Sequence, residues 1–132
     1  MNFDQLHALT ALKYRHSQQQ LAQILKRENT LRAELAKLRG YVAEGRALPP
    51  EQCQMRAIGA DVIWLRWVTK TQDQLNIELA QVMAQKEGHM ARHRKAFGKM
   101  QVSETLAENE RDAKLRARRD QALAQAIDRT VL

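Results

Sequence analysis

Two histidines, His89 and His93, lie four residues apart in the second half of the chain. On a helix both imidazoles project from one face, a spacing that can hold Zn²⁺ or Ni²⁺. No glutamate follows the first histidine directly, no third ligand lies nearby, and Lys86, Arg92 and Arg94 surround the pair with positive charge. We therefore interpret both histidines as polar seam or surface residues and expect no metal site.

Other residue patterns that carry catalysis are missing from the sequence. It has no Gly-rich phosphate loop, no nucleophile elbow and no pair of carboxylates in a predicted pocket. Cys53 is the one cysteine, which excludes an intrachain disulfide or a site of several cysteines and fits a reducing compartment. We expect a protein that is not an enzyme and uses no cofactor.

Basic residues are the main candidate binding feature. The sequence holds 22 Lys and Arg against 15 Asp and Glu, a formal net charge of +7. This excess suggests an acidic protein, nucleic acid or an anionic membrane as partner, while a solvated helix surface explains the same composition without one. Residues 86–99 carry five basic and one acidic side chain, a net charge of +4. The candidate contacts selected there are Arg92, Arg94, Lys95 and Lys99.

Nucleic acid and membrane fit these basic residues less well. No aromatic set interleaves with them, no DNA-reading motif is recognisable, and acidic residues are mixed with the later basic residues of 104–119. Residues 86–100 lack the strong apolar face of a membrane-surface helix. Electrostatic attraction of an acidic protein surface explains the same excess of basic residues. Nucleic acid stays open as the alternative partner.

Trp64 and Trp67 flank Leu65 and Arg66. The helix seam here needs only Leu65 and Val68, so at least one tryptophan must face elsewhere. An exposed tryptophan would be a protein-docking anchor, since Trp and Arg dominate binding hot spots. The alternative is that both tryptophans pack over the first helix near residues 30–33.

The spacing of apolar residues places these candidates on two long helices. Within residues 58–82, apolar residues recur in steps of three, four and seven. This spacing predicts a narrow coiled-coil seam rather than a strand or a globular core. A second apolar stripe, within residues 21–42, is broken only at Glu28. We interpret Glu28 as a polar seam position that fixes the register between the paired helices. The seam positions are Leu21, Ile24, Leu31, Leu35, Leu38 and Val42, and then Ile58, Val62, Leu65, Val68, Leu75, Leu79 and Val82.

Gly45 and Pro49-Pro50 predict where the chain turns, because Gly commonly ends helices and Pro begins them. Helix one is therefore expected at about 2–44, the turn at about 45–50 and helix two at about 51–128. The predicted fold class is all-α: two long helices form an antiparallel coiled-coil hairpin with a C-terminal helical overhang. We expect residues 1–132 to form this single coiled-coil domain.

Folding back at this turn pairs residue i with approximately 97 − i. Phe3 is then expected near Arg94, and the chain after about Phe97 has no partner within the hairpin. Gly98 falls at this limit, where its conformational freedom would let the rest swing. A lone helix in water is marginal, so the overhang is predicted to fray unless a partner covers it.

The sequence contains no segment that predicts a membrane span or a signal peptide. Its first thirty residues have no apolar core segment, and no apolar run approaches the ~20 residues that a span requires. We expect a cytoplasmic protein without membrane insertion.

The chain resembles the FliJ/YscO family, the stalk proteins of flagellar and type III secretion export ATPases. The resemblance covers most of the chain, which is somewhat short for the family. The stretches that carry it are Leu6-His7-Ala8-Leu9-Thr10-Ala11-Leu12-Lys13, Pro49-Pro50, Ile63-Trp64-Leu65-Arg66-Trp67, Arg92-His93-Arg94-Lys95-Ala96-Phe97 and Leu106-Ala107-Glu108.

This resemblance implies a two-helix coiled coil similar to the rotor stalk of rotary ATPases. The helix ends that carry the N- and C-termini would insert into a hexameric export ATPase, and the basic run would lie at that end. Early helix two would contact the membrane export-gate protein, which implies a peripheral location at the inner-membrane export apparatus. The segment implied for the gate is Trp64, Leu65, Arg66, Trp67 and Val68.

Two other functions remain open from the residues themselves. One is a small basic helical protein that binds nucleic acid. The other is a structural, self-assembling coiled coil, including a chaperone for export substrates.

Overall fold

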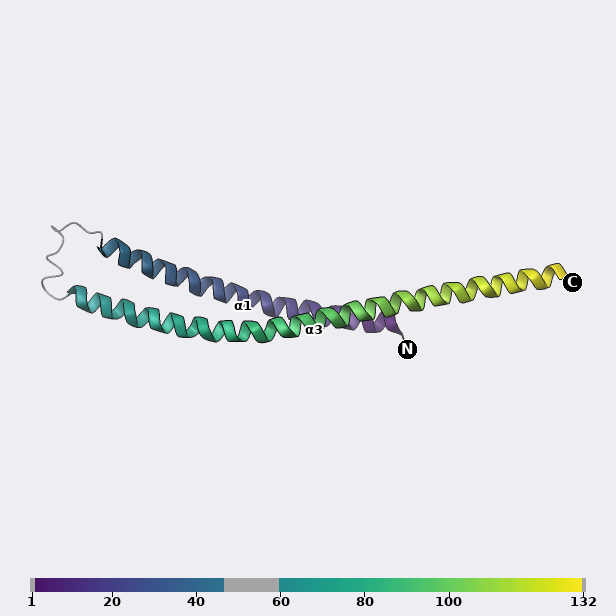
Figure 1. The fold of residues 1–132 in the computed structure, drawn as a ribbon, viewed down its shortest axis with the longest axis horizontal. Coiled ribbons are helices and arrows are strands. Elements are labelled where there is room, and N and C mark those ends of the chain that lie inside the picture. The colour runs from purple at the N-terminus through teal and green to yellow at the C-terminus, as the bar shows by residue number, and fades with distance from the viewer. Residues whose placement is uncertain (1, 47–59, 132) are drawn as a thin grey trace. The chain divides into compact units, whose positions relative to one another are not determined.

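The computed structural model of the chain describes residues 2–46 and 60–131, and it consists of two long helices (Figure 1). Helix α1 spans Phe3–Arg46 and helix α3 spans Ala60–Val131, 44 and 72 residues long. They form an antiparallel helical hairpin, and the described residues contain no strand. The predicted fold class is confirmed.

Both helices follow from local sequence preferences. Ala, Leu, Gln, Arg, Lys and Glu dominate them, and neither contains a proline. At the start of α1 the side-chain oxygen of Asn2 accepts a hydrogen bond of 3.1 Å from the backbone N–H of Asp4, which caps the helix. Arg46 lies in the last turn of α1 and Arg129 in the last turn of α3, where positive charge suits the helix dipole.

The chain divides into two compact units, which we describe separately. The middle unit comprises Gln20–Met90, and the terminal unit comprises Met1–Gln19 with Ala91–Leu132. Each unit pairs a segment of α1 with a segment of α3.

The core of the middle unit is a narrow apolar seam. Leu31, Leu35 and Leu38 of α1 are 0%, 4% and 7% exposed, and Val68 and Val82 of α3 are 3% and 9% exposed. All five belong to the predicted stripe. Five further positions of that stripe are half-buried: Leu21, Ile24, Val42, Leu75 and Leu79. Burial of such side chains is the main stabilising contribution in a two-helix pair, because helix propensity by itself leaves helices marginal in water.

The first turns of the described α3 depart from the predicted seam. Val62 and Leu65 are exposed, so their expected seam positions are wrong. Trp64 is half-buried instead. A Cβ added at Gly45 would lie 3.3 Å from Cη2 of Trp64, so this indole packs beside Gly45 and not over residues 30–33.

The most deeply buried side chains of the terminal unit are small. Its buried residues on α3 are Ser103 and Ala107, 2% and 0% exposed. The backbone N–H of Phe3 donates a hydrogen bond of 3.2 Å to Oε2 of Glu110. Within this unit, α1 therefore lies against α3 as far as residues 110–111.

This register corrects the predicted one. Phe3 lies at Glu110 and not at Arg94, and the expected limit at Phe97 is wrong because Ser103 and Ala107 pack against α1. The predicted pairing assumed a turn at about 45–50, and the bond between Phe3 and Glu110 does not fit that pairing. Gly45 still belongs to α1, while residues 47–50 of the predicted turn and the expected start of helix two at Glu51 lie outside the described residues.

The C-terminal part of α3 continues beyond the paired region of the terminal unit (Figure 1, green to yellow). We call residues 112–131 the arm. All of its described side chains are exposed, including Leu115, Leu123, Ile127 and Val131 at 50–80%. The predicted overhang therefore exists but starts after Arg111, and α3 runs through Gly98 as continuous helix.

Candidate docking surfaces

One flank of the terminal unit carries a basic groove. Lys13 comes from α1 and Arg92, Lys95 and Lys99 from α3, and together with Thr10 and Ala96 they line it. Three of the four basic residues selected in residues 86–99 thus meet at one surface. Arg94 is exposed but does not line this groove.

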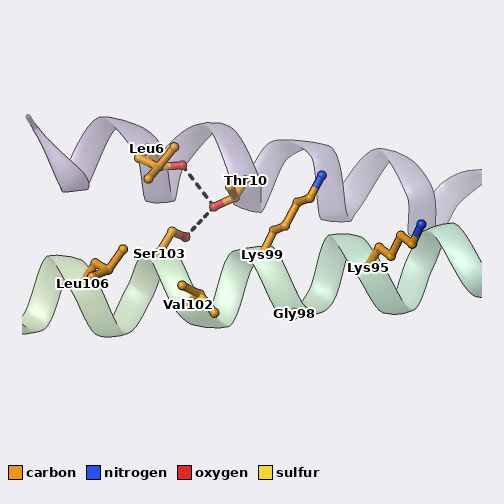
Figure 2. A pocket seen from close by; sticks show the side chains of 8 residues that line it. All are labelled: Leu6, Thr10, Lys95, Gly98, Lys99, Val102, Ser103 and Leu106. Carbon is orange, nitrogen blue, oxygen red and sulfur yellow. Dashed lines mark hydrogen bonds between the residues drawn. The ribbon is translucent and has the colours of Figure 1, made fainter.

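The groove continues toward an apolar stretch (Figure 2). Thr10, Lys95 and Lys99 line both parts, so the two parts form one surface. We call the whole surface the flank groove. Its lining residues are Leu6, Thr10, Lys13, Arg92, Lys95, Ala96, Gly98, Lys99, Val102, Ser103 and Leu106.

The floor of the flank groove is a closed hydrogen-bond network. The hydroxyl oxygens of Thr10 and Ser103 lie 2.6 Å apart across the seam. Thr10 is 3.0 Å from the carbonyl oxygen of Leu6, and Ser103 is 2.7 Å from that of Met100 (Figure 2 shows the first of these). Because these hydroxyls are engaged within the unit, a ligand in the groove meets apolar surface and lysine ammonium groups.

His93 lies in the seam of the terminal unit. Its Nδ1 is 2.8 Å from the hydroxyl of Ser17, and its ring stacks on Tyr14 with centroids 4.9 Å apart. Tyr14 also contacts Phe97 at 5.6 Å. The interpretation of His93 as a polar seam residue is confirmed. In the described part of the chain, no three His, Cys, Asp or Glu side chains come together as a metal site would need.

A second exposed surface lies at the start of the described α3, in the middle unit. Ile63 is 71% exposed and Trp67 is 55% exposed, so one tryptophan faces outward as the seam argument requires. Leu65 and Arg66 line a shallow hollow beside them. Val68 is only 3% exposed, which removes it from the predicted docking segment because it packs in the seam.

Glu28 is a buried charge in the middle unit, 6% exposed. Its carboxylate lies 3.0 Å from Nζ of Lys86 on α3 and 3.0 Å from Nη2 of Arg32 one turn along α1. Hydrogen bonds from Lys86 first and Arg32 second lower the pKa of Glu28, against the raising effect of burial. The sequence located this polar seam position, but not its partners.

Sequence reasoning missed the α1 side of the flank groove and its apolar part. Lys13, Leu6, Val102 and Leu106 were not selected, although each was visible in the sequence. Their assembly depends on the register between α1 and α3, and the predicted register placed residues after Phe97 outside the hairpin.

Comparison of the chain with family models, with curated proteins and with solved structures finds no match. Among the described residues, neither helix contains a stretch that is both long and apolar enough to cross a membrane.

Proposed function

We propose that this chain is a non-enzymatic coiled-coil stalk of a flagellar or type III protein export apparatus. It docks the export ATPase hexamer and links it to the membrane export gate. The observation that carries the proposal is the arm: a helix of about five and a half turns continues from a helical pair with its apolar side chains exposed.

An isolated helix of this length is marginal in water, so the arm is expected to gain most of its order from a partner. Leu115, Leu123 and Ile127 form a thin apolar stripe for such a partner to cover. The resemblance to the stalk family supplies the identity of that partner, a hexameric ATPase whose ring receives the helix ends. Exposed lysines and arginines of residues 92–99, at the same unit, speed association with an acidic surface.

The gate contact is proposed at the exposed start of α3. Trp67 and Ile63 offer large apolar area outside the seam, the composition typical of binding hot spots. Leu65 and Arg66 border them, and Trp64 anchors the segment by packing beside Gly45. These residues belong to the middle unit, and the basic surface belongs to the terminal unit.

The test is co-purification of the tagged full chain with its export ATPase. Reversal of Arg92, Arg94 and Lys95 to Glu should weaken recovery of the ATPase, and removal of residues 112–131 should abolish it. The matched control reverses the exposed Lys26, Lys37 and Arg39 of α1 to Glu, the same change in net charge on the middle unit. Equal recovery with all variants would contradict the proposal.

The second candidate, nucleic-acid binding, is favoured by one observation: Lys13, Arg92, Lys95 and Lys99 gather on one groove. Binding to DNA would then weaken steeply with salt, since phosphate contacts release counterions. A mobility-shift titration at low and physiological salt tests this candidate, and no shift at low salt would eliminate it.

A further inference from the structure

From the flank groove we infer that the terminal unit binds an acidic amphipathic helix of a partner protein. The inference rests on the docking function proposed above for this end of the hairpin, and it names the chemistry of the segment received. It does not depend on which protein supplies that segment.

The apolar part of the groove is open to a partner. Val102 is 61% exposed and Leu106 is 36% exposed, with Leu6 facing them from α1 (Figure 2). A Cβ added at Gly98 would meet no atom within 4 Å, so a side chain from outside can approach the α3 backbone here. Small and apolar lining of this kind receives Leu, Ile or Met from a docked helix.

The positive charge of the groove determines which residues should lie beside the apolar stripe of the bound helix. Lys95 and Lys99 border both its apolar and its basic part, and Lys13 and Arg92 extend the basic part. None of the described residues that line the groove is acidic. A helix with Asp or Glu beside its apolar stripe would complement this lining, whereas a basic helix would be repelled.

The shape of the groove favours a helix over nucleic acid or a bilayer. It runs between α1 and α3, the position that a third helix takes in a bundle. From Lys95 to Leu106 the rise is about 16 Å, which matches a partner segment of about eleven residues. The lining has no aromatic side chain on which a base could stack, and a flat bilayer does not fill a concave surface.

The test is selection of a displayed library of helical peptides of about 14 residues against the full-length chain. We expect enriched peptides to carry apolar residues at i, i+3, i+4 and i+7, with Asp or Glu on either side. The dissociation constant of an enriched peptide is then measured by fluorescence anisotropy. Failure to enrich acidic amphipathic sequences would overturn the inference.

Two pairs of variants locate the binding. Lys95→Glu with Lys99→Glu should weaken peptide binding at least about tenfold, while Lys26→Glu with Lys37→Glu, the same charge change on the middle unit, should leave it within about twofold. Val102→Asn should weaken it about fivefold or more, while Ile77→Asn, at an equally exposed apolar position (61% each), should not. Equal loss in test and control variants would overturn the groove as the site.

The outcomes separate this inference from the proposed function. Peptides that bind the flank groove, in a chain that does not co-purify with an export ATPase, would remove the stalk proposal and leave the groove standing. Recovery of the ATPase without any enriched acidic peptide would overturn the groove inference and leave the stalk proposal standing. If a single-stranded DNA oligonucleotide binds the groove and depends on Lys95 and Lys99 while no peptide does, the site is one for phosphates.

Discussion

The carboxylate of Glu28 lies 3.0 Å from the ammonium group of Lys86, across a seam that is otherwise lined by leucine and valine. The same carboxylate accepts two hydrogen bonds from Arg32, of 3.2 and 3.0 Å. A buried charge of this kind is costly unless it is paired. Shifting α3 along α1 would move Lys86 away and leave Glu28 against apolar residues, so the pair favours one register.

Replacing Glu28 with Leu should raise Tm and loosen the register. The substitution extends the apolar seam, while Lys86 and Arg32, 29% and 52% exposed, can reach water. Thermal unfolding by circular dichroism measures the first effect. Spin labels at residues 37 and 70, in a Cys53→Ser background, measure the second as a broadened distance distribution. A lower Tm with one narrow distance would contradict this account.

Stability should fall as pH drops below the usual glutamate range. The folded-state pKa of Glu28 is lowered from 4.5 by its bonds to Lys86 and Arg32. The contribution is therefore fully present above pH 4.5 and is lost as pH falls through the lower, folded-state pKa. Tm measured between neutral pH and acid should show a smaller decline for Glu28→Gln than for the unaltered chain, with exposed Glu34→Gln as the control.

Leu31→Ala should destabilise the chain by about 2–3 kcal/mol, because Leu31 is fully buried and its loss leaves a cavity in a narrow seam. Leu12→Ala, at a side chain 63% exposed, should change the free energy of unfolding by less than about 0.5 kcal/mol. Urea denaturation of both variants checks this difference. Similar losses would mean that Leu31 does not anchor the seam.

Two glycines of α1 should respond differently to alanine. A Cβ at Gly40 meets nothing within 4 Å, so Gly40→Ala should stabilise by about 0.5–1 kcal/mol through helix propensity. At Gly45 the added Cβ lies 3.3 Å from Trp64, so the indole must shift and the gain should be smaller or reversed. Chemical denaturation measures both effects.

Combining Gly45→Ala with Trp64→Ala provides the control for this pair. Removing the indole should restore the full gain from alanine at Gly45, since the close contact is then absent. A gain at Gly45 equal to that at Gly40, with Trp64 in place, would contradict the packing of Trp64 beside Gly45.

Limited trypsin digestion should cut the arm before it cuts residues 20–46. Its Lys114, Arg116, Arg118 and Arg119 are exposed on a helix without cover in its own unit. Mass spectrometry should detect a fragment that ends near residue 114–119 before cleavage within residues 20–46. Addition of the partner that binds the arm should slow this cut. Cleavage within residues 20–46 before cleavage of the arm would contradict this prediction.

Local sequence determined the helices and most of the seam. Helix formation depends on hydrogen bonds between residues four apart and on side-chain propensity, both of which are local. The apolar period therefore identified Leu31, Leu35 and Leu38, and the break at Glu28 was visible as a polar residue in that period. The density of Lys and Arg in 86–99 was equally plain.

Tertiary structure decided the register, and with it the candidate sites. Sliding one helix by a whole heptad again places apolar positions opposite each other, so the stripe is compatible with several registers. Packing brought Phe3 to Glu110, turned Trp64 inward beside Gly45, and placed Lys13 with Lys95 on one groove. Such contacts between residues far apart in the chain follow from how two surfaces fit, which no local period specifies.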